Sequence, residues 1–131
     1  MERTAVNPVT WSVDKGFHQG ELVSGHTRTL YISGQTATSA EGAPLHDGDM
    51  AAQLALSVDN VAAVLREAGM SLANLVRLNV YTTDVDRLFP HYGLLAERLA
   101  AAGVAPTTTM LGVSRLAIPG QLVELEGTAV A

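Results

Sequence analysis

The sequence contains no cysteine, no cluster of basic residues and no long uninterrupted apolar run. Without cysteine the chain can form no disulfide, no thiolate nucleophile and no thiolate metal site. Acidic residues outnumber basic ones by 13 to 8, whereas a nucleic-acid partner normally requires a basic patch. The first residues lead into no stretch of signal-peptide length, and charges interrupt every candidate bilayer span. These absences predict a soluble, cytoplasmic protein that binds neither nucleic acid nor a membrane.

What the chain does contain suits a single folded domain covering residues 1–131. Hydrophobic residues make up 47% of it and charged residues 16%, which is enough for a packed core and too little charge for disorder. No internal repeat, low-complexity tract or interdomain linker divides the sequence.

The N-terminal half begins with two short β-rich runs, Gly16–Ser24 and Thr29–Ser33. A turn containing Gly25 separates them, so the pattern predicts a hairpin. Ser39–Asp49 is rich in turn residues and is expected to be a loop.

A helix is expected after this loop, with Asp47 or Asp49 as its N-cap and Gly69 at its C-terminal end. Its apolar residues recur at steps of four, three and four, which places them on one face. They are Leu54, Val58, Val61 and Leu65.

The C-terminal half predicts a strand over Leu75–Thr82, then a second helix from Asp84 or Asp86 to Gly103. Pro90 is tolerable only in the first turn of that helix. The apolar stripe of the second helix is Leu88, Tyr92, Leu95 and Leu99. Two further strands, Thr107–Ser114 and Leu122–Val130, are expected on either side of a turn at Ile118–Gly120. The predicted order is β-β-α-β-α-β-β, an α+β fold in which two helices cover one face of a mixed sheet.

Five short motifs, in this order, resemble the Rid (reactive intermediate deaminase, or YjgF) family over about residues 15–130. They are Tyr31–Gln35, Gly48–Met50 with Gln53 and Asn60, Val80–Asp84, Val104–Arg115, and Leu122–Glu126. The resemblance implies a chorismate-mutase-like fold and a homotrimer with three clefts, one between each pair of neighbouring subunits. It also implies imine or enamine chemistry that needs no organic cofactor and no metal.

The resemblance further implies which residues line that cleft. The family's cleft tyrosine falls at Phe17, its serine at Ser33, and its water-positioning glutamate at Glu124, the candidate catalytic residue. The arginine with which deaminating members hold a substrate carboxylate falls at Thr108, within Pro106-Thr107-Thr108. The remaining ligand-binding candidates are Met110, on the same strand face, and Tyr92, near a family asparagine.

Each of these residues also has an ordinary structural interpretation. Glu124 and Glu126 share one strand face, as two solvated acids commonly do. Ser33 beside a glycine is typical of turns, and methionine is a common core filler at Met110. Without a neighbouring arginine, we expect the pKa of Glu124 to be higher than in a deaminase.

The remaining polar residues predict no other kind of site. His18, His26, His46 and His91 lack the spacing of a metal site, and no Gly-x-Ser-x-Gly motif or phosphate loop is present. The sequence leaves open whether His18, next to Phe17, reaches the cleft. Arg115, at the end of a strand, is expected to point to solvent.

Two functions remain in view. The first is a Rid-like trimer that binds a small apolar or aromatic molecule and hydrolyses or tautomerises an imine or enamine, with weak or absent deamination of amino-acid-derived imines. The alternative is a non-catalytic trimer that senses a ligand or binds a partner, because a fold alone does not fix a function.

Overall fold

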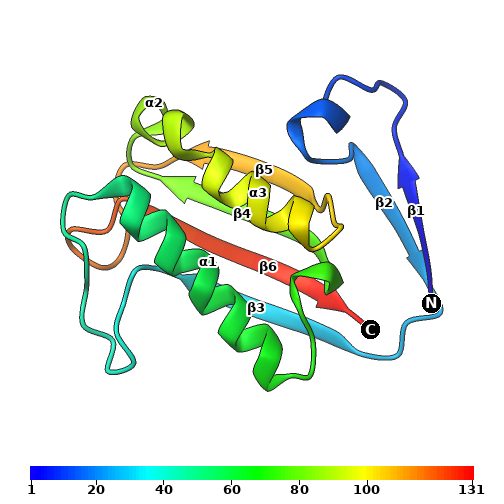
Figure 1. The fold of residues 1–131 in the computed structure, drawn as a ribbon, viewed down its shortest axis with the longest axis horizontal. Helices are drawn as coiled ribbons and strands as arrows, with labels where there is room; N and C mark the ends of the chain where they lie inside the picture. Colours follow the sequence, from blue (N-terminus) through cyan, green and yellow to red (C-terminus); the bar gives the residue numbers. More distant parts are fainter.

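A four-stranded sheet, three helices on one of its faces and a separate β-hairpin make up the protein (Figure 1). The structure is a computed structural model and describes residues 1–131. Its strands are β1 (Glu2–Val6), β2 (Gly20–Ser24), β3 (Thr29–Gln35), β4 (Leu75–Thr82), β5 (Thr107–Gly112) and β6 (Val123–Val130). Its helices are α1 (Met50–Glu67), α2 (Val85–Leu88) and α3 (Gly93–Ala101), with short 3-10 turns at Val13–Lys15, Leu72–Asn74 and Phe89–His91.

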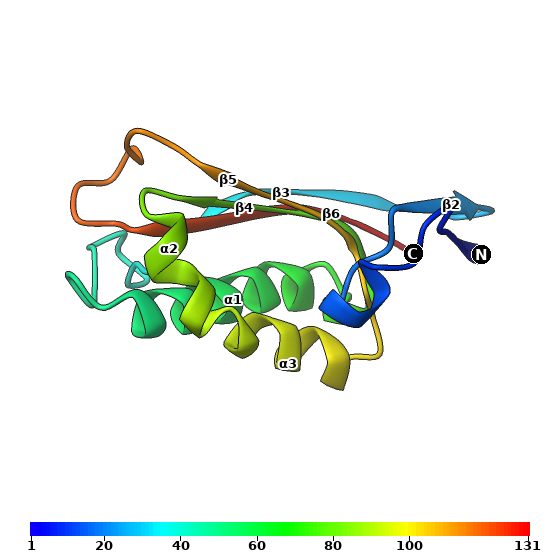
Figure 2. The same cartoon turned by 90° about the horizontal axis from the view of Figure 1, so that it is seen from above.

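The main sheet has the strand order β3-β6-β4-β5. Strand β6 lies antiparallel to β3 and β4, whereas β5 lies parallel to β4. A parallel pair needs a crossover connection, and α2 and α3 supply it on the side of the sheet that α1 also covers (Figure 2). The predicted α+β arrangement is therefore confirmed, and the opposite face of the sheet is bare.

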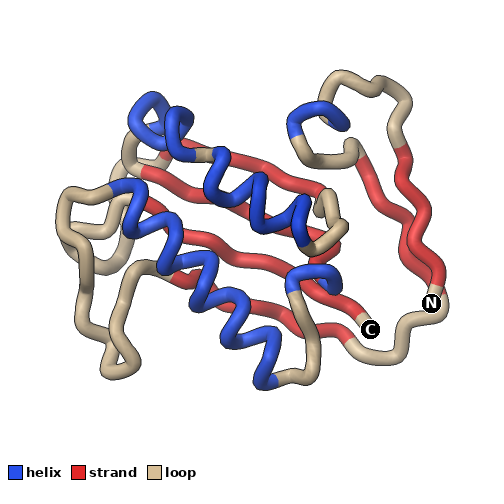
Figure 3. Tube along the Cα trace, in the orientation of Figure 1, coloured by secondary structure: helices blue, strands red, loops and turns tan.

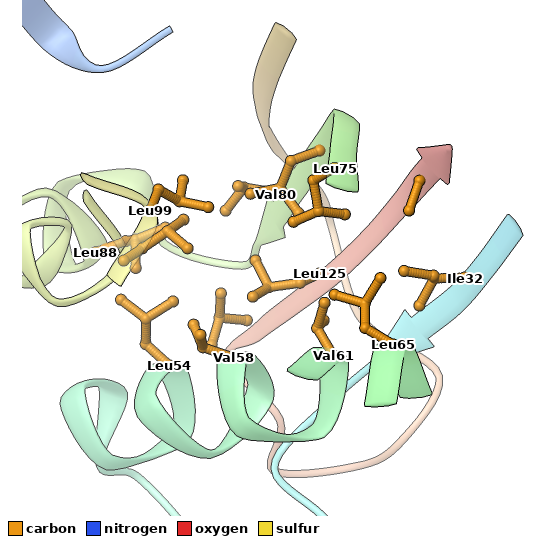
Figure 4. Close-up of a cluster of buried hydrophobic side chains, with 14 of the residues drawn as sticks. Ile32, Leu54, Val58, Val61, Leu65, Leu75, Val80, Leu88, Leu99 and Leu125 are labelled. Carbon is orange, nitrogen blue, oxygen red and sulfur yellow. The ribbon is translucent and has the colours of Figure 1, made fainter. Parts of the chain in front are cut away.

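Helix α1 forms where its apolar period predicts. The side chain of Asp49 accepts a hydrogen bond from the Ala52 amide at 3.1 Å and caps the helix, and Gly69 follows its end with a φ of 71°. The face turned to the sheet carries the buried core shown in Figure 4. From α1 this core contains Leu54, Val58, Val61 and Leu65.

The predicted second helix is broken into two pieces. Asp84 caps α2 by accepting from the Arg87 amide at 3.0 Å, and the 3-10 turn that contains Pro90 then separates α2 from α3. Proline has no N–H to donate and crowds the preceding turn, so the α-helical bonding does not continue through it. The apolar stripe nevertheless holds, because Leu88, Leu95 and Leu99 are buried.

The predicted hairpin between residues 16–24 and 29–33 is wrong. Strand β2 pairs with β1 instead, from Glu2↔Ser24 to Val6↔Gly20, while β3 pairs with β6 (Figure 3). The hairpin of β1 and β2 is tied to the rest of the chain by Arg3, whose guanidinium donates to the carbonyls of Ala73 and Leu75. The observed order has one strand more than predicted, at the N-terminus.

The turn expected at Ile118–Gly120 is present, since the Gln121 amide donates to the Ile118 carbonyl at 3.2 Å. The two strands on either side of it do not pair with each other, because β4 lies between them in the sheet. Strand β5 is therefore an edge strand of the sheet.

Candidate functional site

A hollow of about 450 Å³ opens between strand β5, the segment that leads into α3, and the N-terminal turn. Apolar atoms dominate its walls, as is usual for small-molecule sites. Its lining residues are Lys15, Phe17, Phe89, Tyr92, Gly93, Thr108 and Met110. Four of them are the ligand-binding residues expected from the sequence: Phe17, Tyr92, Thr108 and Met110.

The N-terminal turn brings Phe17 to this hollow. The amides of Lys15 and Phe17 both donate to the carbonyl of Ser12, at 3.0 and 3.2 Å. Between them Gly16 adopts a φ of 89°, a left-handed conformation that glycine tolerates best. The ring of Phe17 meets Trp11 edge to face, with the ring centroids 5.7 Å apart. This tight turn fixes the position of both Lys15 and Phe17.

Strand β5 supplies the floor of the hollow. Thr108 and Met110 lie opposite Leu78 and Val80 of β4, which are buried under the helices, so both face the helical side of the sheet. The hydroxyl of Thr108 donates to the Pro106 carbonyl at 2.8 Å, which leaves it only acceptor capacity toward a ligand.

Tyr92 forms part of the opposite wall. Its ring is half-buried against the hydrophobic core, and its phenolic oxygen has no hydrogen-bond partner within the chain. Burial raises the pKa of the Tyr92 hydroxyl, so it stays protonated near neutral pH and can donate to a ligand.

Glu124 lies on the other face of the sheet. Its neighbours Val123 and Leu125 point into the core, and its cross-strand partner is Tyr81. The carboxyl group of Glu124 reaches over Gly34, which follows Ser33 in β3. Burial raises the pKa of Glu124, and the nearby negative charge of Glu126 raises it further.

Glu126 has hydrogen bonds that the sequence pattern did not reveal. One of its carboxylate oxygens accepts from the hydroxyl of Tyr81 at 2.5 Å and from the amide of Asn79 at 3.0 Å. These bonds lower the pKa of Glu126 and hold it as an anion. Because strand register decides these cross-strand contacts, adjacent acids in a sequence give no sign of them.

Within one protomer the expected residues thus fall into two groups. Phe17, Tyr92, Thr108 and Met110 line the hollow, whereas Ser33 and Glu124 belong to the bare face of the sheet and do not line it. The sequence missed Lys15, Phe89 and Gly93 as lining residues; each is a close neighbour in sequence of a residue that was expected.

The two residues left open are not part of the hollow. His18 lies in the N-terminal hairpin region, where its ring nitrogen is 3.0 Å from the side-chain amide of Asn7. Arg115 is exposed in the loop after β5. No group of three histidine or acidic side chains is close enough to hold a metal ion, and no helix is long and apolar enough to cross a membrane.

Comparisons with known proteins agree on one family. The family model described as Endoribonuclease L-PSP matches residues 17–131. Protein mmf2, mitochondrial, from Schizosaccharomyces pombe is 29% identical, and the alignment covers 96% of each chain. The Rid family protein YyfB from Yersinia pestis is 33% identical, with a TM-score of 0.82 and complete coverage of both chains. Escherichia coli TdcF, whose structure contains bound serine, is 25% identical, with a TM-score of 0.70 over 88% of this chain and 87% of TdcF.

Proposed function

Because the chain belongs to the Endoribonuclease L-PSP family, also called the Rid, YjgF or RutC family, we propose that it is a cytoplasmic homotrimer that binds a small molecule between subunits. Each subunit contributes one domain of residues 1–131. The ligand is small and largely apolar or aromatic, since apolar atoms dominate the walls of the hollow. The serine bound to TdcF supports a small-molecule ligand.

One observation carries this proposal: the site residues are divided between the two faces of the sheet. Thr108 and Met110 face the helical side, and Glu124 faces the bare side. A sheet prevents these side chains from meeting within one protomer. A second copy that places its bare face beside the hollow brings Ser33 and Glu124 to the ligand.

The bare face of the sheet carries exposed apolar side chains that such an assembly would cover. Tyr31 on β3 is 79% exposed and Leu111 on β5 is 49% exposed, both on this side of the sheet. Covering these two side chains in an assembly would remove apolar surface from water, which favours association. Light scattering at micromolar protein tests the trimer, and a monomer mass would contradict both the assembly and the shared site.

The proposed chemistry is hydrolysis or tautomerisation of an imine or enamine. In hydrolysis, Glu124 accepts a proton from water as the water oxygen bonds to the imine carbon. Glu124 returns this proton to the nitrogen, which gives a carbinolamine. The hydroxyl proton of the carbinolamine then passes to the nitrogen as the carbon–nitrogen bond breaks, and a carbonyl compound and ammonia are left. A raised pKa suits this exchange, because it makes the Glu124 carboxylate a stronger base toward water than an ordinary glutamate. Ser33 and Thr108 bond the ligand, and Phe17, Tyr92 and Met110 form its apolar surroundings.

A non-catalytic sensor or partner-binding trimer is the second candidate. What favours it is Thr108, which stands where the resemblance places the carboxylate-binding arginine and whose hydroxyl proton is already bonded to Pro106. Native mass spectrometry of the purified protein tests for a retained ligand without presuming a reaction. A panel of imines generated by an amino-acid oxidase then distinguishes the two candidates, since only the enzyme accelerates ammonia release.

Glu124→Gln tests the role of the carboxyl group. Glutamine keeps the size of glutamate but cannot exchange a proton, so turnover is expected to fall while the fold is retained. Glu67→Gln, at the exposed end of α1, is the matched control. Unchanged turnover in Glu124→Gln would contradict the catalytic role.

A further inference from the structure

The one positive charge at the hollow comes from an unexpected place. Lys15 is the only lysine in the sequence and the only basic residue among the lining residues. It belongs to the N-terminal turn and not to strand β5, whose Thr107, Thr108 and Thr109 are neutral.

Lys15 has no partner within the chain. The two ion pairs of the protein are Arg3 with Glu21 and Arg98 with Asp59, and no hydrogen bond is made by the Lys15 ammonium. The neighbouring Asp14 lies in the same turn without pairing with it. The ammonium is therefore free to bind a group that enters the hollow.

The other polar groups of the hollow, together with Lys15, favour an anionic ligand. The Tyr92 hydroxyl is an unused donor, and Thr108 has only acceptor capacity left. The hollow therefore presents one cation and one neutral donor amid apolar walls. A neutral carbonyl could accept only an ordinary hydrogen bond from the ammonium, whereas a carboxylate would form a stronger, charge-assisted bond.

We infer that Lys15 sets the specificity of this hollow for a small apolar or aromatic carboxylate, with Tyr92 as the second donor to the carboxylate. The inference rests on the proposed function, because it assigns a ligand class to the same hollow. The apolar part of the ligand lies against Phe17, Phe89 and Met110, and the carboxylate lies at the rim beside Lys15. The cation thus comes from the segment between β1 and β2.

Binding of phenylacetate and of its neutral analogue phenylacetamide, measured by calorimetry at low salt, tests this inference. Wild-type protein is expected to bind the carboxylate about tenfold more tightly than the amide. Lys15→Gln is expected to remove that preference, and Lys15→Arg to keep it. Arg66→Gln, which removes an equal charge from the exposed side of α1, is the control and is expected to bind like wild type.

Labelling gives a second measurement. Lys15 and the N-terminal amine are the two amines that an amine-directed acylating reagent can modify, and peptide mass spectrometry follows the two separately. Phenylacetate is expected to slow acylation of Lys15 but not of the N-terminus, and phenylacetamide to slow neither.

Three results would overturn the role of Lys15: equal affinity for the two probes in wild type, no binding of either probe, or an unchanged preference in Lys15→Gln. Failure of the proposed function looks different. If the protein is a trimer and binds both probes equally, the proposed ligand site is retained and only the Lys15 inference fails. If the protein is a monomer, the shared site fails whatever Lys15 does.

Discussion

The carboxyl group of Glu124 fills the space above Gly34: a Cβ atom at Gly34 would lie 1.7 Å from Oε1 of Glu124. The φ angle of Gly34 is not positive, so its backbone conformation does not require glycine. The missing side chain instead makes room for the carboxyl group of Glu124. This contact joins β3 to β6 on the bare face of the sheet, and it offers a way to move Glu124 without mutating it.

Gly34→Ala is expected to displace the Glu124 carboxyl group while the fold is retained. The obstructing atom is the end of a flexible side chain, so the free energy of unfolding should change by less than about 1 kcal/mol. The displaced group becomes more exposed, and its pKa, measured by carbon-13 NMR of the carboxyl carbon, should fall toward that of an ordinary glutamate. Gly20→Ala, where a Cβ would make an ordinary 3.5 Å contact with Val6, is the control and should leave that pKa unchanged. An unaltered Glu124 pKa in Gly34→Ala would show that the contact is unimportant.

Glu124 and Glu126 should affect stability in opposite directions as the pH changes. The raised pKa of Glu124 means that the folded state favours its protonated form, so its ionisation costs stability as the pH rises from the ordinary glutamate value through the folded-state pKa. The lowered pKa of Glu126 means that its contribution is present above the ordinary value and is lost as the pH falls through the folded-state pKa.

Thermal unfolding at pH 7 and at pH 4 measures this difference. The stability of Glu124→Gln relative to wild type should be higher at pH 7 than at pH 4. The stability of Glu126→Gln relative to wild type should be lower at pH 7 than at pH 4. The bonds from Tyr81 and Asn79 also make Glu126→Gln unsuitable as a silent control, although sequence spacing suggested it had no role. The same sign for both variants would contradict the assignment of the two carboxyl groups.

Deamination of iminopropionate is expected to be weak or absent. Thr108 offers no charge, and its hydroxyl proton is bonded to Pro106. A bidentate arginine–carboxylate pair contains two charge-assisted bonds of about 1.5–3 kcal/mol each, which a single exposed ammonium at Lys15 does not replace. The methyl group of iminopropionate also leaves most of the apolar hollow unfilled. Turnover equal to that of an arginine-containing relative, assayed alongside, would show that another cation holds the carboxylate.

Gln53 is expected to be a major determinant of stability outside the site. It is fully buried, its amide donates to the carbonyls of His46 and Gly120 at 3.0 Å, and its oxygen accepts from the Leu122 amide at 2.7 Å. Gln53→Leu leaves the Gly120 carbonyl and the Leu122 amide without their partners, at about 1–3 kcal/mol for each group, whereas the His46 carbonyl keeps its bond from the Asp49 amide. Urea unfolding should show a loss of several kcal/mol, whereas Glu67→Gln should lie close to wild type. A loss below 1 kcal/mol would mean that water replaces the missing bonds.

Local patterns predicted the central elements because burial determines them. The period of Leu54, Val58, Val61 and Leu65 is that of a helix with one buried face, and Asp49 is a cap by its chemistry. Strand β1 was missed because its residues are mostly exposed and carry no burial pattern. The partner of β2 was predicted wrongly because strand pairing depends on distant segments. Strand β3 pairs with β6, 90 to 101 residues further along the chain, and β2 pairs with β1.

The site was predictable only in part, for a related reason. Alternation on β5 correctly placed Thr108 and Met110 on one side, and both line the hollow. The alternation of apolar and polar residues on β6 also placed Glu124 on one face of its strand. The sequence does not reveal that this face lies on the side of the sheet opposite to Thr108 and Met110. Lys15 could not be recognised either, because a charged residue in a turn is ordinarily solvated and only the fold brings it to an apolar hollow.

The central claim is that the two groups of site residues meet across a subunit interface, and cross-linking tests it most directly. Because the chain has no cysteine, Ser33→Cys and Met110→Cys introduce the only thiols. Within one protomer these positions lie on opposite faces of the sheet, so a short bismaleimide joins them only between copies. The double variant is expected to give covalent dimers and trimers on a denaturing gel, and each single variant mainly monomer. A double variant that stays monomeric while both thiols react would contradict the shared site.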